Sequence, residues 1–174
     1  SRYAGGGWQS YFNSLRMALA TAVVGTALIF TGAYLSEKSS APLRLKALYR
    51  VIAMLPMAVP GLVLGLSYIF FLNERANPLE VLYGTLTVLV ISTVVHYYTV
   101  SHLTAVTALR QLDDEFEAVS DSLKASRLRM FFKITVPICM PSILDIFIYL
   151  FMNAMTTVSA VVFLYSTNTS LASV

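Results

Sequence analysis

Long uncharged stretches divide the chain into apolar segments separated by short charged ones. The clearest stretch lies between Arg16 and Glu37, where twenty residues include no Asp, Glu, Lys or Arg. At a rise of about 1.5 Å per residue, a helix of this length covers about 30 Å, the thickness of the hydrocarbon core of a bilayer. The same pattern predicts four membrane-spanning helices, at residues 17–36, 51–73, 81–102 and 137–165.

The second apolar stretch contains two prolines, Pro56 and Pro60. Proline lacks a backbone donor and its ring clashes with the preceding turn, so a kink or a break is predicted in this span. Gly61 and Gly65 follow as a GxxxG pattern, which is typical of close helix packing and also of a hinge in a moving span.

Basic residues concentrate in two alternate connecting segments. Four of the twelve lie between residues 38 and 50, and five lie in the segment 103–136, which we call the charged loop. The positive-inside rule predicts that both segments face the cytoplasm, so the segment around Arg75 and the N-terminus face outward.

Composition agrees with a membrane protein. Hydrophobic residues make up 57% of the 174 residues and charged residues 12%, whereas soluble domains carry about a quarter charged residues. The net charge of +3 is too small to indicate nucleic-acid binding. The single Cys139 excludes an internal disulfide, and neighbours at zinc-site spacing are lacking, so we expect no metal site. Because the chain does not begin with Met, we expect it to be a fragment of a longer one.

The first half of the charged loop has helical periodicity. Apolar residues recur at i, i+4, i+7 and i+11 and predict one face of an amphipathic helix, while acidic residues occupy much of the remainder. The apolar positions are Leu112, Phe116, Val119 and Leu123.

A second short helix is predicted after Lys124. Ser126 is suited to cap its first turn, and Leu128, Phe131 and Phe132 would share a face. A helix, a tight turn and another helix therefore form a candidate docking element, because proteins often recognise a helix in a surface groove.

The charged loop resembles the cytoplasmic loop of bacterial ABC-importer permeases. That loop has the pattern E-A-A, three residues, Gly, nine residues, Ile, one residue, Leu-Pro. Aligned on Ile134 and Pro137, the two outright matches, the pattern places Val136 at Leu and Lys124 at Gly, and Glu117 stands one residue early. The departure at Lys124 puts the turn geometry in doubt.

Two further stretches, HYYTVSHLTAVTALRQLDDEFEAVSDSLKAS and DIFIYLFMNAMTTVSAVVFLY, resemble permeases for 2-aminoethylphosphonate. The resemblance implies an all-α, polytopic fold: the core of a type-1 ABC importer permease (MetI-like), in the bacterial inner membrane. Residues 1–174 would form one incomplete domain of this kind. Such cores have about five or six spans, so one helix before and one after this chain would be missing.

The resemblance also implies partners. The charged loop would dock into a cytoplasmic ABC ATPase, and a periplasmic binding protein would deliver substrate. A second permease domain would complete the path, as a homodimer, a heterodimer or a fused half. ATP and Mg would be bound by the ATPase and no cofactor by this chain, which lacks the phosphate-binding GxxxxGK[ST] pattern and should not be an enzyme. The implied docking residues are Glu117, Ala118, Asp121, Ser122, Leu123, Lys124, Ala125 and Ser126.

Polar residues within the spans are candidates for the substrate path, because each is costly in hydrocarbon unless it faces protein or water. Asp145 could attract the substrate's amine or pair with a neighbouring helix. His96 and His102 lie near the predicted end of the third span, where interfacial residues are expected. The other candidates, which could bind a phosphonate or bridge helices, are Asn153, Thr156, Thr157 and Ser159.

Three alternatives remain open from the sequence. The same importer class could carry ferric iron, sulfate, thiosulfate or a polyamine. The chain could be a membrane scaffold that recruits a cytoplasmic partner without transport. It could also be an ion-coupled transporter in which Asp145 or His96 carries protons.

Overall fold

The computed structural model describes residues 2–39, 41–74, 77–113, 116, 122 and 126–156, with no side-chain description for residues 2–7. Every regular element within these residues is a helix, as expected for an all-α protein. The elements are α1 (Arg2–Lys38), α2 (Leu43–Ala58), α3 (Gly61–Leu72), η1 (Pro78–Leu82), α4 (Leu86–His96), α5 (Tyr98–Arg110), α7 (Arg127–Met130), η2 (Phe131–Thr135), α8 (Val136–Ile138) and α9 (Met140–Thr156).

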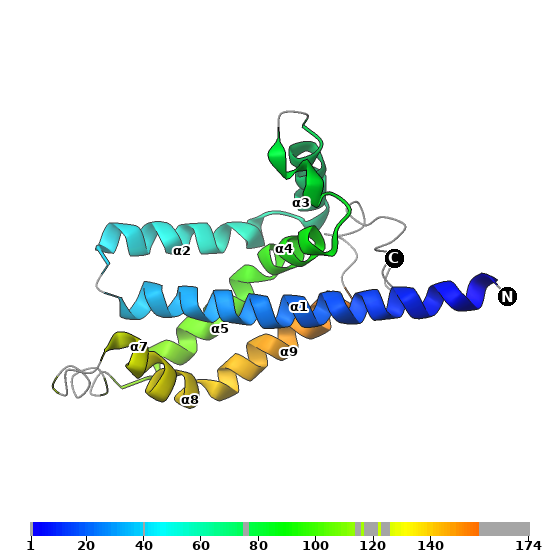
Figure 1. Ribbon diagram of the computed structural model, residues 1–174. Helices are drawn as coiled ribbons and strands as arrows, with labels where there is room; N and C mark the ends of the chain where they lie inside the picture. Colours follow the sequence, from blue (N-terminus) through cyan, green and yellow to red (C-terminus); the bar gives the residue numbers. More distant parts are fainter. Residues whose placement is uncertain are drawn as a thin grey trace.

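Helix α1 is the axis of the fold. Its 37 residues span about 55 Å, well beyond the predicted segment 17–36. In Figure 1, α2 runs along one side of α1, and α5 and α9 run along the other. Gly25 permits the close crossing with α9, because a Cβ there would lie 2.7 Å from Cδ1 of Leu150. Small residues at such crossings let two backbones approach closely.

The remaining apolar stretches are bent pairs of helices. The α2–α3 pair turns by 105°, the α4–α5 pair by 57°, and the segment 127–138 meets α9 at 75°. Pro60 caps α3, so the predicted break occurs there, whereas Pro56 lies inside α2. Within the described residues, α1 alone is long and apolar enough to cross a bilayer, and there are four crossings if each bent pair forms one.

Other helix bounds also differ from the predicted spans. Helix α2 begins at Leu43 and α4 at Leu86, whereas the second and third spans are predicted to begin at residues 51 and 81. Helix α5 continues to Arg110, whereas the third span was predicted to end at residue 102. The chain bends at Cys139, so the helix of the fourth span begins at Met140 instead of Pro137. Because α5 extends to Arg110, residues 103–110 of the charged loop are part of the helical bundle.

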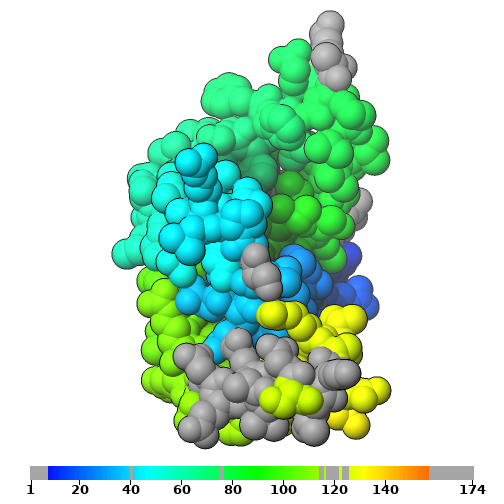
Figure 2. All heavy atoms as spheres, turned by 90° about the vertical axis from the view of Figure 1, so that its left-hand side faces the viewer, coloured from blue at the N-terminus to red at the C-terminus, as the bar shows by residue number. Residues whose placement is uncertain are grey.

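The core forms around the inner faces of α1, α5 and α9. Ile29, Ala33, Leu109 and Leu150 are buried there. A smaller cluster joins Met17 of α1 to α3 and α4. The end of α1, the start of α2, the end of α5 and all of α7 gather at one end of the molecule, and Figure 2 looks onto that end.

Candidate functional site

The second half of the charged loop begins with a capped helix. The Ser126 Oγ accepts a hydrogen bond from the backbone N–H of Arg129 at 3.3 Å, which confirms the predicted N-cap. The helix continues as α7 and then widens into the π-helical η2. Single turns of π-helix are rare and frequently occur at functional sites.

The prediction that three apolar residues of this segment share one face is wrong. Phe131 is 9% exposed and packs on Phe30 and Tyr34, with ring centroids 6.0 and 4.6 Å away. Leu128 and Phe132 are 72% and 65% exposed. Leu128 and Phe132 are four positions apart and therefore lie on the same, outer side of the helix. The ring of Phe131 packs into the core. Phe131 therefore anchors the segment, and the other two remain open to a partner.

Of the eight predicted docking residues, Ser122 and Ser126 fall within the described part of the chain. The others lie outside the described residues, as does most of the predicted amphipathic helix, so that helix stays a prediction. Its described members, Leu112 and Phe116, share a narrow crevice with Tyr34, Met130 and Ile134. The two halves of the charged loop therefore meet against α1.

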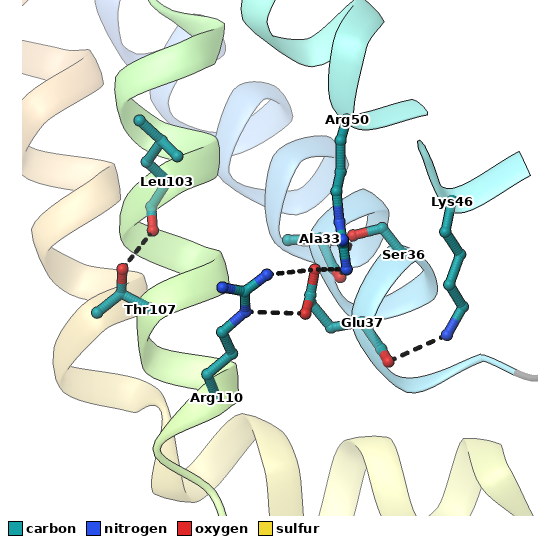
Figure 3. Close-up of polar contacts among 8 residues, drawn as sticks. All are labelled: Ala33, Ser36, Glu37, Lys46, Arg50, Leu103, Thr107 and Arg110. Atoms are coloured by element: carbon teal, nitrogen blue, oxygen red, sulfur yellow. Dashed lines mark hydrogen bonds and ion pairs between the residues drawn. The ribbon is translucent and has the colours of Figure 1, made fainter. Parts of the chain in front are cut away.

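A charged cluster that the sequence pattern does not predict joins the helices at this end (Figure 3). Glu37, in the last turn of α1, accepts from Arg50 Nη2 of α2 on Oε1 and from Arg110 Nε of α5 on Oε2, each at 3.0 Å. Arg110 Nη2 also reaches Oε1, at 3.5 Å. Glu37 lies past the uncharged stretch of α1. Partial burial favours its neutral form, but hydrogen bonds and charge from Arg110 and Arg50 outweigh this and lower the pKa of the carboxyl.

The backbone at the end of α1 receives two further bonds. Lys46 Nζ donates to the carbonyl of Glu37 at 3.2 Å, and Arg127 Nη1 donates to the carbonyl of Lys38 at 2.8 Å. The last carbonyls of a helix lack partners within it, and cationic side chains suit its negative end. We call Glu37, Lys38, Lys46, Arg50, Arg110 and Arg127 the Glu37 cluster.

One sequence signal could have indicated this cluster. Glu37 is the single acid among residues 37–50, a segment that carries four basic residues. Its partner Arg110 lies in the segment 103–136, which the sequence pattern predicts to be a loop. The distance of 73 positions between Glu37 and Arg110 hid the pairing.

The path candidates of the last span are separated by the structure. Asp145 and Thr156 are eleven positions apart, about three turns, and lie on the exposed face of α9. Asn153 is half-buried and donates to the carbonyl of Tyr149 at 2.7 Å. Thr156 binds the carbonyl of Met152 in its own helix. Thr157 and Ser159 lie outside the described residues.

His102 does not lie at a helix end, contrary to the expectation of an interfacial position. It is buried in the middle of α5, where its ring stacks on Tyr98 and meets Tyr49 edge-on. The two tyrosine hydroxyl oxygens are 2.6 Å apart. Among the described residues no group of three or more His, Cys, Asp or Glu side chains could hold a metal ion.

A groove that the sequence pattern does not predict runs along α5. Its volume is about 430 Å³, and it extends to Met57 of α2 and Ser142 of α9. Thr104, Thr107 and Gln111 supply polar groups from one side of α5. Both threonine hydroxyls donate to carbonyls one turn earlier, which satisfies them within the helix.

Comparison with known proteins identifies related chains. The profile of a family described as binding-protein-dependent transport system inner membrane component matches residues 28–172. The chain is 33% identical over 167 residues to the ferric transport system permease protein FbpB of Actinobacillus pleuropneumoniae, which covers 96% of this chain and 24% of that protein. It is also 33% identical over 164 residues to the putative ferric transport system permease protein FbpB 1 of Haemophilus influenzae, covering 94% and 25%.

A shorter match reaches 44% identity over 62 residues of a putative ferric transport system permease-like protein, AfuB, of Escherichia coli K12. It covers 36% of this chain and 52% of that protein. The chain spans about a quarter of the length of the first two relatives. The names of these relatives do not support the expectation of a phosphonate substrate, whereas ferric iron was among the alternatives.

Proposed function

Because the chain belongs to the family of binding-protein-dependent transport system inner membrane components, with a MetI-like all-α membrane fold, we propose that it forms part of the permease of an ATP-driven importer. Four crossings, the upper count that the helices of the described residues allow, would place it as a multi-pass protein of the bacterial inner membrane. A second permease domain completes the path, and a periplasmic binding protein supplies it. ATP is bound and hydrolysed, with Mg, by separate ABC ATPase subunits.

The charged loop is the ATPase docking element in this proposal. Support comes from the exposed Leu128 and Phe132, which lie beside a ring, Phe131, that is fixed in the core. Apolar side chains on a rigid support lose little freedom when a partner covers them. The predicted docking residues from Glu117 to Ser126 precede this pair and would complete the contact surface.

The proposed substrate is ferric iron, delivered by its binding protein. The observation that carries this choice is the 33% identity over 96% of the chain to a ferric transport permease. The competing substrate is 2-aminoethylphosphonate, favoured by the resemblance of the stretch that begins at His96. Asp145 and Thr156, on the open face of α9, are the described residues that we assign to the path for either substrate.

A genetic test distinguishes the two substrates. The segment encoding this chain would be deleted in its own organism, and uptake of radiolabelled ferric iron would be compared with growth on 2-aminoethylphosphonate as sole phosphorus source. We expect iron uptake to fall while growth on the phosphonate persists. The reverse result would favour the phosphonate, and no change in either would count against transport of both.

A second measurement tests the energy source. Uptake in the wild type should stop when ATP is depleted and continue when the ion gradient is collapsed. Uptake that instead follows the gradient would support an ion-coupled transporter with Asp145 or His96 as the proton carrier. Binding of the ATPase without any uptake would support a scaffold.

A further inference from the structure

Residues 111–126 of the charged loop contain the predicted docking residues. The residues on both sides of this part are tied to the same turn of α1. Arg110, the last residue of α5, pairs with the Glu37 carboxylate before this part begins, and Arg127, the first residue of α7, donates to the Lys38 carbonyl after it ends. The residues that flank the segment 111–126 are therefore both held at the last turn of α1. A partner that pulls on them pulls on the end of α1.

The same turn of α1 is tied to α2. Arg50 shares the Glu37 carboxylate with Arg110, and Lys46 donates to the Glu37 carbonyl. Helix α2 leads directly to the 105° break and α3. A continuous set of polar contacts therefore runs from the charged loop, through the last turn of α1, to the broken helix pair.

The carboxylate of Glu37 is suited to exchange between its partners. Arg50 Nη2 donates to Oε1 at 3.0 Å, and Arg110 Nη2 donates a longer hydrogen bond, at 3.5 Å, to the same atom. If α2 moved away, Arg110 could close a two-pronged pair with both oxygens, the favoured geometry for arginine and a carboxylate. Two discrete arrangements of one carboxylate are what a switching element requires.

Stability alone gives a weak reason for this arrangement. The two arginine side chains are 46% and 58% exposed, although the Glu37 side chain is 10% exposed. An ion pair whose cations are open to water and salt contributes less to folding than a fully buried one. Apolar packing of Ile29 and Ala33 already holds α1 against its neighbours. The geometry instead suits the transfer of motion between helices.

We propose that the last turn of α1 relays movement of the ATPase-docked loop to α2, with Glu37 as the positioning residue of the relay. This inference rests on the proposed function. It predicts that loss of the carboxylate leaves ATPase binding intact but weakens the link between substrate arrival and ATP hydrolysis.

The test uses proteoliposomes with the permease that carries this chain, its ATPase and its binding protein loaded with ferric iron. Glu37→Gln and Arg50→Gln should each reduce the stimulation of ATP hydrolysis by loaded binding protein about fivefold or more. Arg44→Gln is the matched control, because Arg44 is an exposed arginine on the same helix outside the cluster. The double variant should be no worse than either single one, as for residues of one contact.

Each outcome is decisive. If the wild type shows no stimulation, the proposed ferric-iron importer fails and the relay that rests on it fails too. If the wild type is stimulated and Glu37→Gln and Arg50→Gln behave like Arg44→Gln, the relay fails and the importer stands. If the two variants lose ATPase binding in parallel with stimulation, Glu37 shapes the docking surface only, and the relay is overturned.

Discussion

The Glu37 cluster and the turn around Asn77 use polar contacts in opposite ways. In the cluster, side chains join residues 73 and 89 positions apart and link α1 to α5 and α7. At the turn, Asn77 donates to the carbonyl of Phe71, six positions away, and accepts from the N–H of Leu79, two positions away. The first set of bonds connects helices, and the second shapes a single turn.

This difference indicates where motion can be transmitted. Displacement of one member of the Glu37 cluster must disturb another helix, because each bond crosses between elements. Displacement of Asn77 acts on contacts close to it in sequence, because its side-chain bonds reach Phe71 and Leu79. The charged loop adjoins the first region, which agrees with its proposed role as the point where force enters.

The largest expected effect tests the anchor beneath the Glu37 cluster. Phe131→Ala removes a buried ring that packs on Phe30 and Tyr34 and should lower the free energy of unfolding by about 3 kcal/mol or more. Phe132→Ala is the control, because its ring is exposed and its loss should cost less than about 1 kcal/mol. Thermal unfolding of both purified variants measures the contrast. Equal losses would show that Phe131 is not the anchor.

A change of pH tests the charge at the cluster itself. The pKa of Glu37 is lowered in the folded protein, so its stabilising effect is present at neutral pH and disappears as the pH falls through that lowered value. Because the arginines are exposed, we expect about 1 kcal/mol. Unfolding temperatures of the wild type and Glu37→Gln should therefore differ at pH 7 and converge in acid. A gap that persists in acid would contradict the assignment.

Hydrogen exchange compares the two regions directly. Arg127→Ala should speed backbone exchange in α7 and also at the end of α1, whereas Asn77→Ala should act only between residues 71 and 85. Loss of about 1 kcal/mol of hydrogen bonding corresponds to roughly fivefold faster local exchange. If Asn77→Ala also altered α1, the contrast between linked and local contacts would be wrong.

The smallest effect concerns the helix cap at the exit of the charged loop. Ser126→Ala removes the acceptor for the N–H of Arg129 and should destabilise α7 by about 0.5–1 kcal/mol, whereas Ser126→Asp keeps an acceptor there. Exchange of the α7 amides provides the measurement. Similar exchange in the two variants would mean that the cap contributes nothing.

Much of the fold could be predicted because its causes are local. Uncharged stretches indicated apolar helices, Pro60 indicated a break, and Ser126 indicated a cap, since each effect depends on neighbouring residues. Helix ends were less predictable. The apolar pattern predicts a third span that ends at residue 102, yet α5 continues to Arg110 and tertiary packing buries His102 against Tyr49 and Tyr98.

The candidate sites show the same division. The sequence marked the charged loop as a docking element, and that role stays a prediction, as does most of the predicted docking surface. It did not indicate that Phe131 faces the core while Phe132 faces outward, because that choice depends on where Phe30 and Tyr34 lie. The sequence also did not indicate that Asp145 and Thr156 are exposed while Asn153 is half-buried. Packing against α1 decides which face of α9 is covered.

The sequence by itself determined that this chain forms apolar helices with most of its basic residues gathered in two alternate segments between uncharged stretches. The length of an apolar segment and the spacing of charged residues are properties of the sequence and do not depend on how the chain folds. Only the tertiary structure decided that Glu37 holds Arg50 and Arg110 at once. A carboxylate acts over a few ångströms, and the residues within that reach are set by how helices distant in sequence are packed together.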